Sequence, residues 1–460
     1  MISGSLSEWA TAMDGELLGP DGHFAGVSTD SRSQARGALF FALRGEHFDG
    51  ADFLSAAISG GATGVVLSRP LPEDVPQIIV KDTRGALADC ARTWRGRFDI
   101  PVIGVTGSNG KTTVKELTAS ILRAEWGAES VLASRRSFNN EIGLPLTLLD
   151  LSGTHNAAVL EFGASRPGDI ASLSEIALPT IGAVLNASPA HLQELRDVEN
   201  VAREKGVLMS SLVSGGVGVI PAGTPFSDYW QDLLGERTVL RFGGDGDFRA
   251  RNAKGINSGL GFELHCPAGV APVETGLIGA HNLRNALAAC ALAAAAGAGL
   301  NAMAAGLRGR EGVSGRLRVH EPGAGVRLID DSYNANPASM SAAIGVLAGQ
   351  EGERWLVVGD MAELGQDSAQ WHRRVGEEAA RAGIERLYCA GEQSRQAAEA
   401  FGAGARWRSG VGDLCRLLTD DLKADVTILV KGSRFMGMER AVAALLDAAG
   451  VLNGENAEHG

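Results

Sequence analysis

The segment Gly107–Thr113 has the residue types and spacing of a loop that binds nucleotide phosphates. It follows the strand-like run 101–106 and precedes a helical pattern, which is the context that a phosphate loop requires. Backbone N–H groups of such a loop surround phosphate oxygens, Lys111 reaches the β- and γ-phosphates, and the Thr112 hydroxyl binds Mg²⁺. Val105 replaces the first glycine of the full motif, so the loop is a shortened form. The pattern predicts that ATP or GTP is bound with Mg²⁺ by Gly107, Ser108, Asn109, Gly110, Lys111, Thr112 and Thr113.

Two further strand-like runs, 157–162 and 181–186, lead to residues that could bind a metal ion. Glu161 stands at the end of the first run, and His191 follows the second. The carboxyl ends of parallel strands meet at one edge of a sheet, so we expect both side chains beside the phosphate loop. A carboxylate and an imidazole could hold a metal there. Taken alone, however, either residue is more often a hydrogen-bonded loop residue.

Lys205 interrupts the apolar stripe of a predicted helix over residues 198–213. At this position its ammonium group would lie on the buried face of the helix. It could extend to the surface or pair with a carboxylate, as lysines at helix edges often do. Alternatively, it could turn inward toward phosphate, metal or a carboxylate, or be converted chemically to a neutral or anionic group. The sequence leaves both interpretations open.

Polar residues also occur at the start of the alanine-rich helix that follows. His281, Asn282 and Asn285 share one face of this helix. Amide side chains at this place could contact a nucleotide, or they could cap the helix. The spacing does not distinguish these two roles.

A second set of candidate nucleotide ligands lies where the next strand-helix pattern begins. Arg316 precedes the strand-like run 326–330, which leads into Asp331. A carboxylate at a strand end can accept hydrogen bonds from ribose hydroxyls, and Arg316 could reach the γ-phosphate across a cleft. Asp331 lies rather far upstream to be the N-cap of the helix that begins at Pro337, so we predict a role in ligand binding.

The elements that must position these residues predict an α/β protein with three domains. The chain has 460 residues, and domains usually comprise about 100–200. Residues 1–98 mix short apolar runs with glycine-rich turns and predict a small α/β domain. Residues 99–310 alternate strands with helices, which is typical of a mainly parallel sheet, and residues 311–455 restart the alternation as a Rossmann-like domain. Hinges are expected near 98–100 and 308–314. The strand-like runs are 38–43, 64–67, 77–80, 101–106, 157–162, 181–186, 326–330, 355–360, 386–391 and 427–432.

Composition restricts where such a protein works. The net charge of −12 would repel nucleic acid and anionic lipid, so an anionic ligand must be bound by local cations. The five cysteines are an odd number, lie far apart and form no Cys-x-x-Cys pair, which is typical of a reducing compartment. The first residues lack a signal-peptide pattern, and the most apolar run, 286–300, is shorter than the ~20 residues that span a bilayer. We expect a cytoplasmic protein that does not insert into membranes.

Taken together, the motifs resemble those of the Mur ligase family, the ATP-dependent amide-forming enzymes of peptidoglycan assembly. The matching segments occur in the family's order: 107–113, 161–165, 186–191, 202–206, 281–285 and 315–316. Segments 331–337 and 359–365 are similar to those of family members that act on UDP-N-acetylmuramoyl-tripeptide and D-alanyl-D-alanine. The Asp-Asn-Pro-Arg motif of the diaminopimelate-adding relative is absent. Segments 29–32 and 40–50 are similar to the uridine-diphosphate domain that these two ligases share.

The resemblance implies an activity and roles for individual residues. It implies amide-bond formation through an acyl phosphate by a monomer that serves cell-wall biogenesis, cell shape and cell division. Lys111, His191, Lys205 and Arg316 would be catalytic. Two Mg²⁺ ions would be held by Thr112, Glu161, His191 and a carbamate on Lys205. Adenine would lie beside Asn282 and Asn285, ribose at Asp331, the γ-phosphate at Arg316 and uridine diphosphate near Ser31 and Arg32. Weaker candidates for the substrate side of the third domain are Asn334, Asn336, Lys431, Ser433 and Arg434.

Two other functions share part of this pattern. Folylpolyglutamate synthetase has a similar central loop, but the segment Asp30-Ser31-Arg32 argues against it. A regulatory ATPase that binds nucleotide without ligation would explain the phosphate loop. It would explain neither Lys205 nor matching motifs in three domains.

Overall fold

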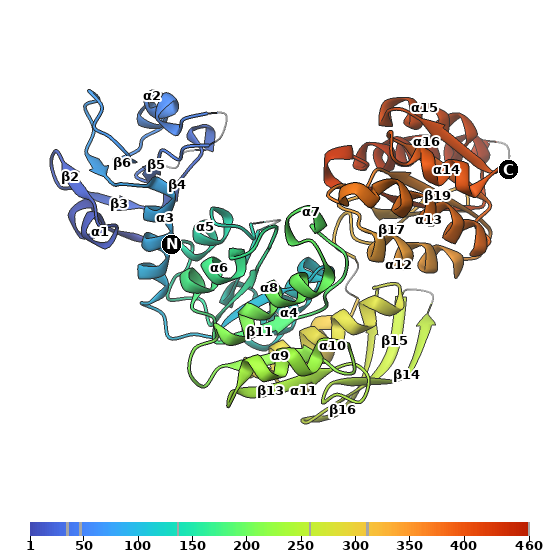
Figure 1. Cartoon of the computed structure of the whole chain (residues 1–460), viewed down its shortest axis with the longest axis horizontal. Coiled ribbons are helices and arrows are strands. Elements are labelled where there is room, and N and C mark those ends of the chain that lie inside the picture. The colour runs from blue at the N-terminus through green and yellow to red at the C-terminus, as the bar shows by residue number, and fades with distance from the viewer. Residues whose placement is uncertain (34–35, 46–47, 136–137, 257–258, 310–311, 459–460) are drawn as a thin grey trace.

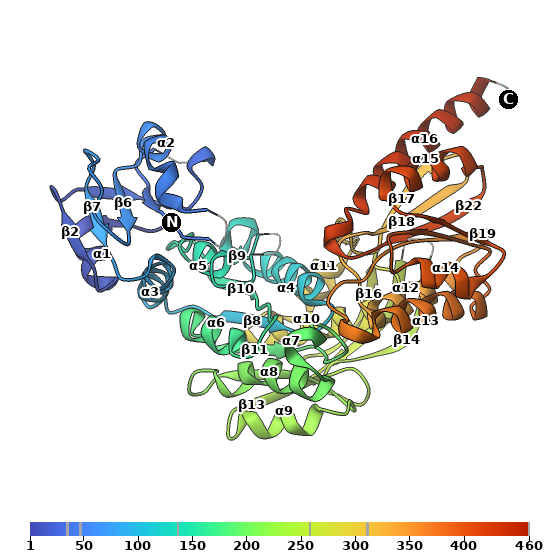
Figure 2. The same cartoon turned by 45° about the horizontal axis from the view of Figure 1, so that its top comes forward.

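The computed structural model describes residues 1–33, 36–45, 48–135, 138–256, 259–309 and 312–458, with side chains placed as far as residue 451. Three α/β domains follow one another along the chain, and both views place the first and third at opposite ends of the central one (Figures 1 and 2). This confirms the predicted class and number of domains. The predicted limit between the second and third domains, 310/311, lies outside the described residues, as does the middle of the predicted hinge 308–314. The domain limits stay a prediction.

The N-terminal domain is built on a five-stranded sheet in which β2 is antiparallel to its neighbour and the other pairs are parallel. Its strand order is β2 (Glu16–Leu18), β7 (Gln77–Ile79), β6 (Gly64–Leu67), β5 (Leu39–Phe41) and β4 (Val27–Ser28). A two-stranded ribbon of β1 (Ser3–Ser5) and β3 (His23–Ala25) lies beside it, and the helices are α1 (Leu6–Ala12), α2 (Leu54–Ser59) and α3 (Thr83–Arg95). The three apolar runs predicted in this domain therefore form β5, β6 and β7.

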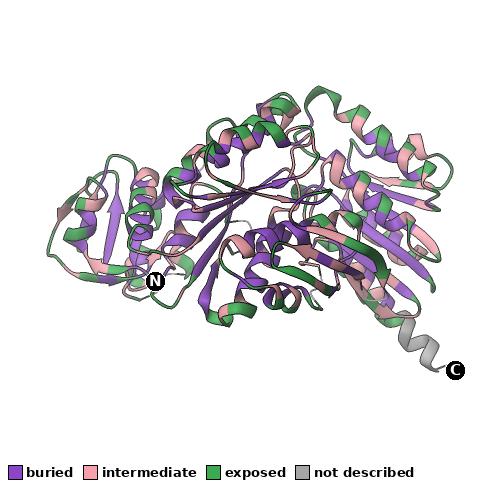
Figure 3. Ribbon diagram, turned by 90° about the horizontal axis from the view of Figure 1, so that it is seen from below, coloured by how far each residue is buried: buried purple, intermediate pink, exposed green. Residues whose placement is uncertain are grey.

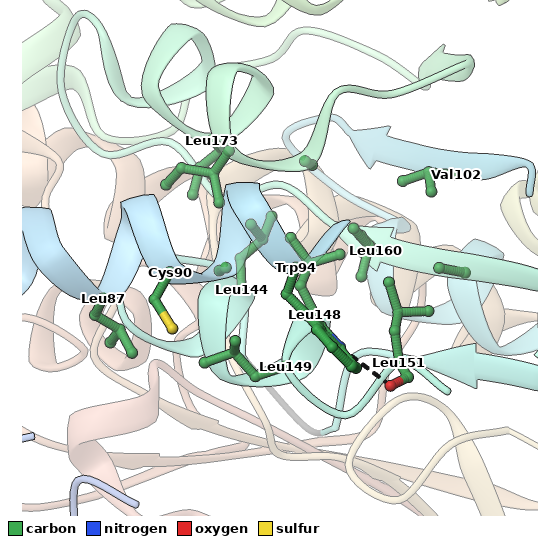
Figure 4. Packing of buried hydrophobic residues seen from close by; sticks show 14 of the residues in the cluster. Leu87, Cys90, Trp94, Val102, Leu144, Leu148, Leu149, Leu151, Leu160 and Leu173 are labelled. Carbon is green, nitrogen blue, oxygen red and sulfur yellow. Dashed lines mark hydrogen bonds between the residues drawn. The ribbon is translucent and has the colours of Figure 1, made fainter. Parts of the chain in front are cut away.

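Helix α3 attaches this domain to the central one through a shared apolar core. Leu87, Cys90 and Trp94 of α3 pack in one cluster with Leu144 and Leu148 of α5 (Gly143–Leu148) (Figure 4). The Trp94 indole N–H also donates to the Leu151 carbonyl at 3.1 Å. Separating the two domains would expose this apolar surface to water, so the core opposes motion at the predicted hinge 98–100.

The central domain is organised around β8 (Val102–Thr106), which leads into the phosphate loop. Its six-stranded sheet is parallel throughout. The strand order is β13 (Thr238–Phe242), β12 (Val217–Pro221), β11 (Ile181–Val184), β8, β10 (Ala157–Glu161) and β9 (Val131–Ala133). Because β10 and β11 flank β8, the residues that follow all three strands meet at one edge of the sheet.

Helices lie on both faces of this sheet, and its strands β8, β10 and β11 are buried along their whole length (Figure 3). The helices of the domain are α4 (Lys111–Trp126), α5, α6 (Asp169–Ala177), α7 (Leu192–Leu195), α8 (Val198–Ser210), α9 (Ser227–Leu234), α10 (Ala280–Ala295) and α11 (Leu300–Leu307). The alanine-rich α10 packs on α4, where small side chains allow close approach of the two helices. The N-terminus of α10 thereby comes next to the phosphate loop.

A three-stranded antiparallel sheet in this domain was not expected from the sequence. It consists of β14 (Arg249–Ile256), β15 (Gly259–Cys266) and β16 (Gly269–Thr275). Strand β14 is exposed or half-buried along its whole length, so it carries few of the apolar residues that mark a strand. Phe262, Leu264 and Val273 are buried and connect the sheet to the apolar core that α10 shares.

The C-terminal domain has a six-stranded sheet with helices on both faces, as predicted for a Rossmann-like unit. The order is β17 (Arg318–Gly323), β18 (Val326–Asp331), β22 (Val426–Lys431), β19 (Glu353–Gly359), β20 (Arg386–Ala390) and β21 (Ala405–Arg408), with β17 antiparallel to β18. The helices are α12 (Pro337–Ala348), α13 (Ser368–Arg381), α14 (Arg395–Phe401), α15 (Val411–Asp421) and α16 (Glu439–Glu458). Across the described ranges, none of the helices combines the length and the apolar character needed to cross a bilayer.

Candidate active site

The phosphate loop connects β8 to α4 and requires glycine at position 110. Gly110 has φ +87°, and a Cβ atom there would lie 2.5 Å from the Asn285 side-chain oxygen. The Lys111 ammonium folds back and donates to the Gly107 carbonyl at 2.8 Å. Burial lowers the pKa of Lys111, and the nearby charge of Arg316 adds to this effect. A helix N-terminus and two cations thus lie together, an arrangement that electrostatically favours an anion.

Glu161 lies beside the phosphate loop because β10 is the neighbour of β8. The Thr112 hydroxyl donates to one of its carboxylate oxygens at 2.7 Å, and the Asn139 amide donates to the other at 2.9 Å. The carboxylate is almost completely buried. A hydroxyl and a carboxylate thus converge at the place where the sequence predicted metal ligands.

Lys205 turns into the interior of the protein. Its side chain is 1% exposed, and its ammonium group has no hydrogen-bond partner among the described residues. Burial, together with the charge of Lys111, lowers the pKa of Lys205 from 10.5 to about 7. The interpretation as a surface lysine is therefore wrong. The helix itself ends at Ser210, earlier than predicted.

His191 follows β11 at the same sheet edge and meets the C-terminal domain. Its Nδ1 atom contacts the Oε2 atom of Glu363, which lies in the segment after β19. The close contact with His191 lowers the pKa of Glu363. Within the described residues, no group of three or more His, Cys, Asp or Glu side chains could hold a metal. Any metal here would need ligands from water, substrate or other side chains.

A cleft of about 300 Å³ lies between the phosphate loop, the start of α10 and the C-terminal domain. Most of the predicted site residues line it: Ser108, Asn109, Gly110, Lys111, Thr113, Asn282, Asn285, Arg316, Asp331, Asn334, Asn336 and Lys431. The tertiary structure thus brings together residues from two domains. The other predicted residues are not in its lining: Gly107, Thr112, Glu161, His191, Lys205, Ser31, Arg32, Ser433 and Arg434.

The two asparagines of α10 form a chain of hydrogen bonds. The Asn285 amide donates to the Asn282 side-chain oxygen at 2.8 Å, and the Asn282 amide donates to the Ile278 carbonyl at 2.9 Å. Gly279 is the N-cap residue, and no side chain in the described part of the protein caps this helix. The capping interpretation of these amides is wrong, and Asn285 instead abuts the phosphate loop at Gly110.

Asp331 pairs with Lys431 on the opposite wall of the cleft. Lys431 donates to the Asp331 carboxylate at 2.6 Å and to the Asn334 carbonyl at 2.9 Å. Burial nevertheless raises the pKa of Asp331. The N-cap of α12 is Asn336, which forms a capping box with Ser339, so Asp331 does not cap this helix, as predicted.

We expect Lys431→Met to lower the free energy of unfolding by about 3–5 kcal/mol at pH 7, because the Asp331 carboxylate loses its partner while it stays buried. The loss should shrink as the pH falls, since protonation removes the unpaired charge. Urea unfolding at several pH values measures it. Lys423→Met is the control, because Lys423 pairs with Glu353 in a more exposed place, where about 0–1 kcal/mol is at stake. Equal losses in the two variants would contradict the prediction.

The remaining predicted residues have other surroundings. Ser31 and Arg32 lie in the N-terminal domain, away from the cleft, and the exposed Arg32 pairs with Asp30 at 2.8 Å. Ser433 is buried and accepts a hydrogen bond from the Ala362 N–H at 2.9 Å. Arg434 is exposed and pairs with Glu439. The Arg316 guanidinium stacks on the Tyr333 ring at 4.3 Å, which fixes its direction at the cleft.

Three residues of this region were given no role from the sequence: Asn139, Glu363 and Lys115. Asn139 binds Glu161, and Glu363 contacts His191, although both come from segments far away in the chain. Lys115, one turn after Lys111, is fully buried and donates to the Ser134 carbonyl at 2.5 Å. Only the occurrence of Glu363 in segment 359–365 could have drawn attention to it.

A second cavity, of about 530 Å³, is lined by residues of the central domain and by helix α3 of the N-terminal domain. Arg84 of α3 and Asn139, Asn140 and Arg166 of the central domain contribute to its lining. The cavity thus extends from Asn139, which donates a hydrogen bond to Glu161, to a helix of the N-terminal domain.

Comparison with known proteins places this geometry in a family. Three Mur ligase models match the chain: the family catalytic domain over residues 23–95, the middle domain over 105–293 and the glutamate ligase domain over 315–434. The chain is 42% identical to UDP-N-acetylmuramoyl-tripeptide–D-alanyl-D-alanine ligase of Escherichia coli, covering 97% of this chain and 99% of that one.

Solved structures give the same result. MurF from Acinetobacter baumannii is similar with a TM-score of 0.91 and 31% identity, covering 97% of this chain and 99% of that one. MurF ligase from Thermotoga maritima, solved in complex with ADP, has a TM-score of 0.82 and 28% identity, with 92% and 97% covered. Matches to all three domains, at this identity and over nearly the whole length, show that the chain belongs to the Mur ligase family.

Proposed function

We propose that this chain is an ATP-dependent ligase that joins D-alanyl-D-alanine to UDP-N-acetylmuramoyl-tripeptide and so forms the pentapeptide precursor of peptidoglycan. The observation that carries the proposal is the 42% identity, over nearly the full length of both chains, to an Escherichia coli ligase named for these substrates. The cleft supplies the parts that such a reaction needs, and the ADP complex of a similar structure supports an adenine nucleotide.

The nucleotide would occupy the cleft with its phosphates on the loop at Lys111. The backbone N–H groups of the loop and the N-terminus of α4 suit the β- and γ-phosphates. Asn282 and Asn285 would then lie beside adenine, and Asp331 would accept hydrogen bonds from the ribose. Arg316, held against Tyr333, would approach the γ-phosphate from the C-terminal domain.

The chemistry would proceed in two steps. The terminal carboxylate of the tripeptide attacks the γ-phosphorus of ATP, ADP leaves, and an acyl phosphate forms. The neutral amine of D-alanyl-D-alanine then attacks the acyl carbon, phosphate leaves, and the amide is complete. Lys111 and Arg316 stabilise the negative charge that develops on the transferred group. Since water would hydrolyse an acyl phosphate, the C-terminal domain must cover the site during the reaction.

The tripeptide would reach the site through the cavity lined by Asn139 and Arg84. The two arginines in its lining already face carboxylates, Arg84 facing Glu141 at 3.9 Å and Arg166 facing Asp169 at 3.1 Å. They would exchange these partners for the acidic groups of the substrate. The uridine diphosphate would extend toward Ser31 and Arg32 in the N-terminal domain. On the C-terminal side, Asn334, Asn336, Lys431, Ser433 and Arg434 remain candidates for contacts with the second substrate.

The residues beside the phosphate loop fit Mg²⁺. The Thr112 hydroxyl and the Glu161 carboxylate converge at 2.7 Å and are oxygen ligands, which Mg²⁺ prefers. Nitrogen is a poorer ligand than oxygen for Mg²⁺. His191 would therefore bind the ion only as one ligand among phosphate and water oxygens that fill the other coordination positions. When bound, two such ions would neutralise charge on the β- and γ-phosphates. The protein's part is to hold the ligands in place.

We further propose that Lys205 is carbamylated. A buried amine without a partner among the described residues can react with CO₂ once it is unprotonated, and the lowered pKa of about 7 makes the free amine abundant at neutral pH. The amine nitrogen forms a bond to the carbon of CO₂ and releases a proton to solvent, so the product is a carbamate anion with two oxygen atoms. It would balance the charge of Lys111 and give the metal a further oxygen ligand.

The substrates also suggest where the protein works. ATP and a UDP-linked precursor are cytoplasmic compounds, so we propose a cytoplasmic enzyme that acts as a monomer. Size-exclusion chromatography with light scattering would test the monomeric state.

Phosphate release from ATP tests the function. We expect release only when UDP-N-acetylmuramoyl-tripeptide and D-alanyl-D-alanine are both present, with formation of the pentapeptide shown by mass spectrometry. Release without either substrate would indicate a regulatory ATPase instead. Release that requires a folate and glutamate would indicate a folylpolyglutamate synthetase. Either outcome would overturn the proposal.

A further inference from the structure

The contact between His191 and Glu363 joins two domains through residues with unusual backbones. His191 has φ 53° and Glu363 has φ 61°. Residues other than glycine seldom adopt this left-handed conformation, and they keep it only where the surrounding structure fixes them. Because both partners of one interdomain contact are held in this way, the contact is a specific feature of the molecule.

The backbone before Glu363 is held by buried polar groups of its own domain. The Asp360 carboxylate accepts a hydrogen bond from the Ser394 N–H at 2.7 Å. The next two N–H groups of the segment donate to the His372 ring nitrogen and to the Ser433 hydroxyl, both at 2.9 Å. Asp360, His372, Ser394 and Ser433 are all buried. The segment is therefore rigidly attached to the C-terminal domain, and Glu363 moves with that domain.

A second contact connects the same two domains at the phosphate loop. The Asn336 amide donates to the Asn109 side-chain oxygen at 2.8 Å, and Asn109 also donates to the Ser188 hydroxyl. Ser188 lies in the segment that leads to His191. The C-terminal domain thus contacts the central domain at two points close to the predicted reaction centre.

The two ring nitrogens of His191 have different surroundings. Nδ1 faces the Glu363 carboxylate, which leaves Nε2 as the nitrogen that can face another ligand. Histidines that bind metals commonly donate the N–H of their other nitrogen to a carboxylate, which fixes both the ring orientation and the tautomer. Here the carboxylate comes from a different domain than the histidine.

We propose that Glu363 is a positioning residue. When the C-terminal domain rests on the central domain, Glu363 pairs with His191 Nδ1, accepts its proton in a hydrogen bond and so leaves Nε2 as the nitrogen that would serve a metal. The inference rests on the metal-binding role of His191 in the proposed function. It makes the productive orientation of the imidazole depend on the position of the C-terminal domain, so that the site is complete only when it is covered.

Kinetics of Glu363→Ala give the first test. We expect kcat to fall by about 10–100-fold, as is typical when such a carboxylate partner is removed, while KM for ATP changes less than about twofold. Glu363→Gln retains an acceptor oxygen and should recover part of kcat. Glu399→Gln is the matched control, since Glu399 is an exposed residue of the same domain paired with Arg395, and it should behave as the native protein. Native kcat in Glu363→Ala would overturn the proposal.

NMR of the full-length, metal-free protein with ¹⁵N-labelled histidine gives a second readout. The His191 signals are assigned with His191→Gln. We expect the Nδ1–H tautomer in the native protein and a changed tautomer population in Glu363→Ala, with Glu363→Gln between them. Unchanged ring signals in both variants would overturn the proposal. This measurement needs no turnover, so it remains decisive if the native protein fails to release phosphate and the proposed function falls.

Discussion

Lys205→Ala is expected to reduce phosphate release by at least about 10³-fold, and short carboxylates such as formate or acetate should restore part of the rate. The substitution removes the atom that would carry the carbamate, and it leaves a cavity at a buried position where a small anion can bind. The measurement is the rate of phosphate release against carboxylate concentration. A variant with native activity would contradict the carbamate proposal.

The protein contains a matched control for this experiment. Lys115 is as deeply buried as Lys205, but its ammonium group is already bound to the Ser134 carbonyl and to Glu116. Lys115→Ala should therefore lose stability, with no recovery of activity on addition of carboxylate. Recovery in both variants would show that the carboxylate acts elsewhere.

The same lysine gives a test of the lowered pKa. In buffer free of CO₂, we expect Lys205→Met to be more stable than the native protein by a free energy on the order of 4 kcal/mol near pH 7, because the unfolded chain binds a proton that the native amine gives up. The native protein gains stability as the pH rises from about 7 toward 10.5. The difference between the variants should therefore shrink over this range, as measured by urea unfolding at several pH values.

Lys111→Ala is the second substitution with a large expected effect. We expect kcat/KM for ATP to fall by about 10³-fold or more, because a cation in a dry site stabilises charge that develops on the transferred phosphoryl group. The fold should persist, since the replaced ammonium contributes one hydrogen bond to the Gly107 carbonyl. Phosphate release and circular dichroism measure the two parts of this prediction.

Lys111→Arg separates charge from geometry at this position. The Lys111 ammonium is a compact point charge that donates to the Gly107 carbonyl, whereas a guanidinium is planar and carries its charge on a wider fork that does not reproduce this position. We therefore expect no recovery of the rate, although the charge is retained. A Lys111→Ala variant within tenfold of the native rate would show that Arg316 alone can balance the phosphate charge.

Much of the fold could be predicted because the signals are local. Runs of apolar residues form β5, β6, β7 and most strands of the two large sheets. Each run can be recognised from its own residues, without knowing which strands lie beside it in the sheet. The antiparallel sheet β14–β16 escaped because β14 is mainly exposed and thus lacks an apolar pattern. The core shared by α3 and α5 escaped because no pattern within either helix specifies its partner.

By itself, the sequence determined the phosphate loop, the strand ends that carry Glu161 and Asp331, and the family resemblance, since each depends on residues that are close in the chain. The tertiary structure decided the rest. It turned Lys205 inward, abutted Asn285 on Gly110, and joined Asn109 to Asn336 across 227 residues. It also set Glu363 against His191. Such contacts depend on which faces of the helices and sheets pack together. The whole chain decides this packing, because the native fold reduces the exposed apolar surface of all elements at once.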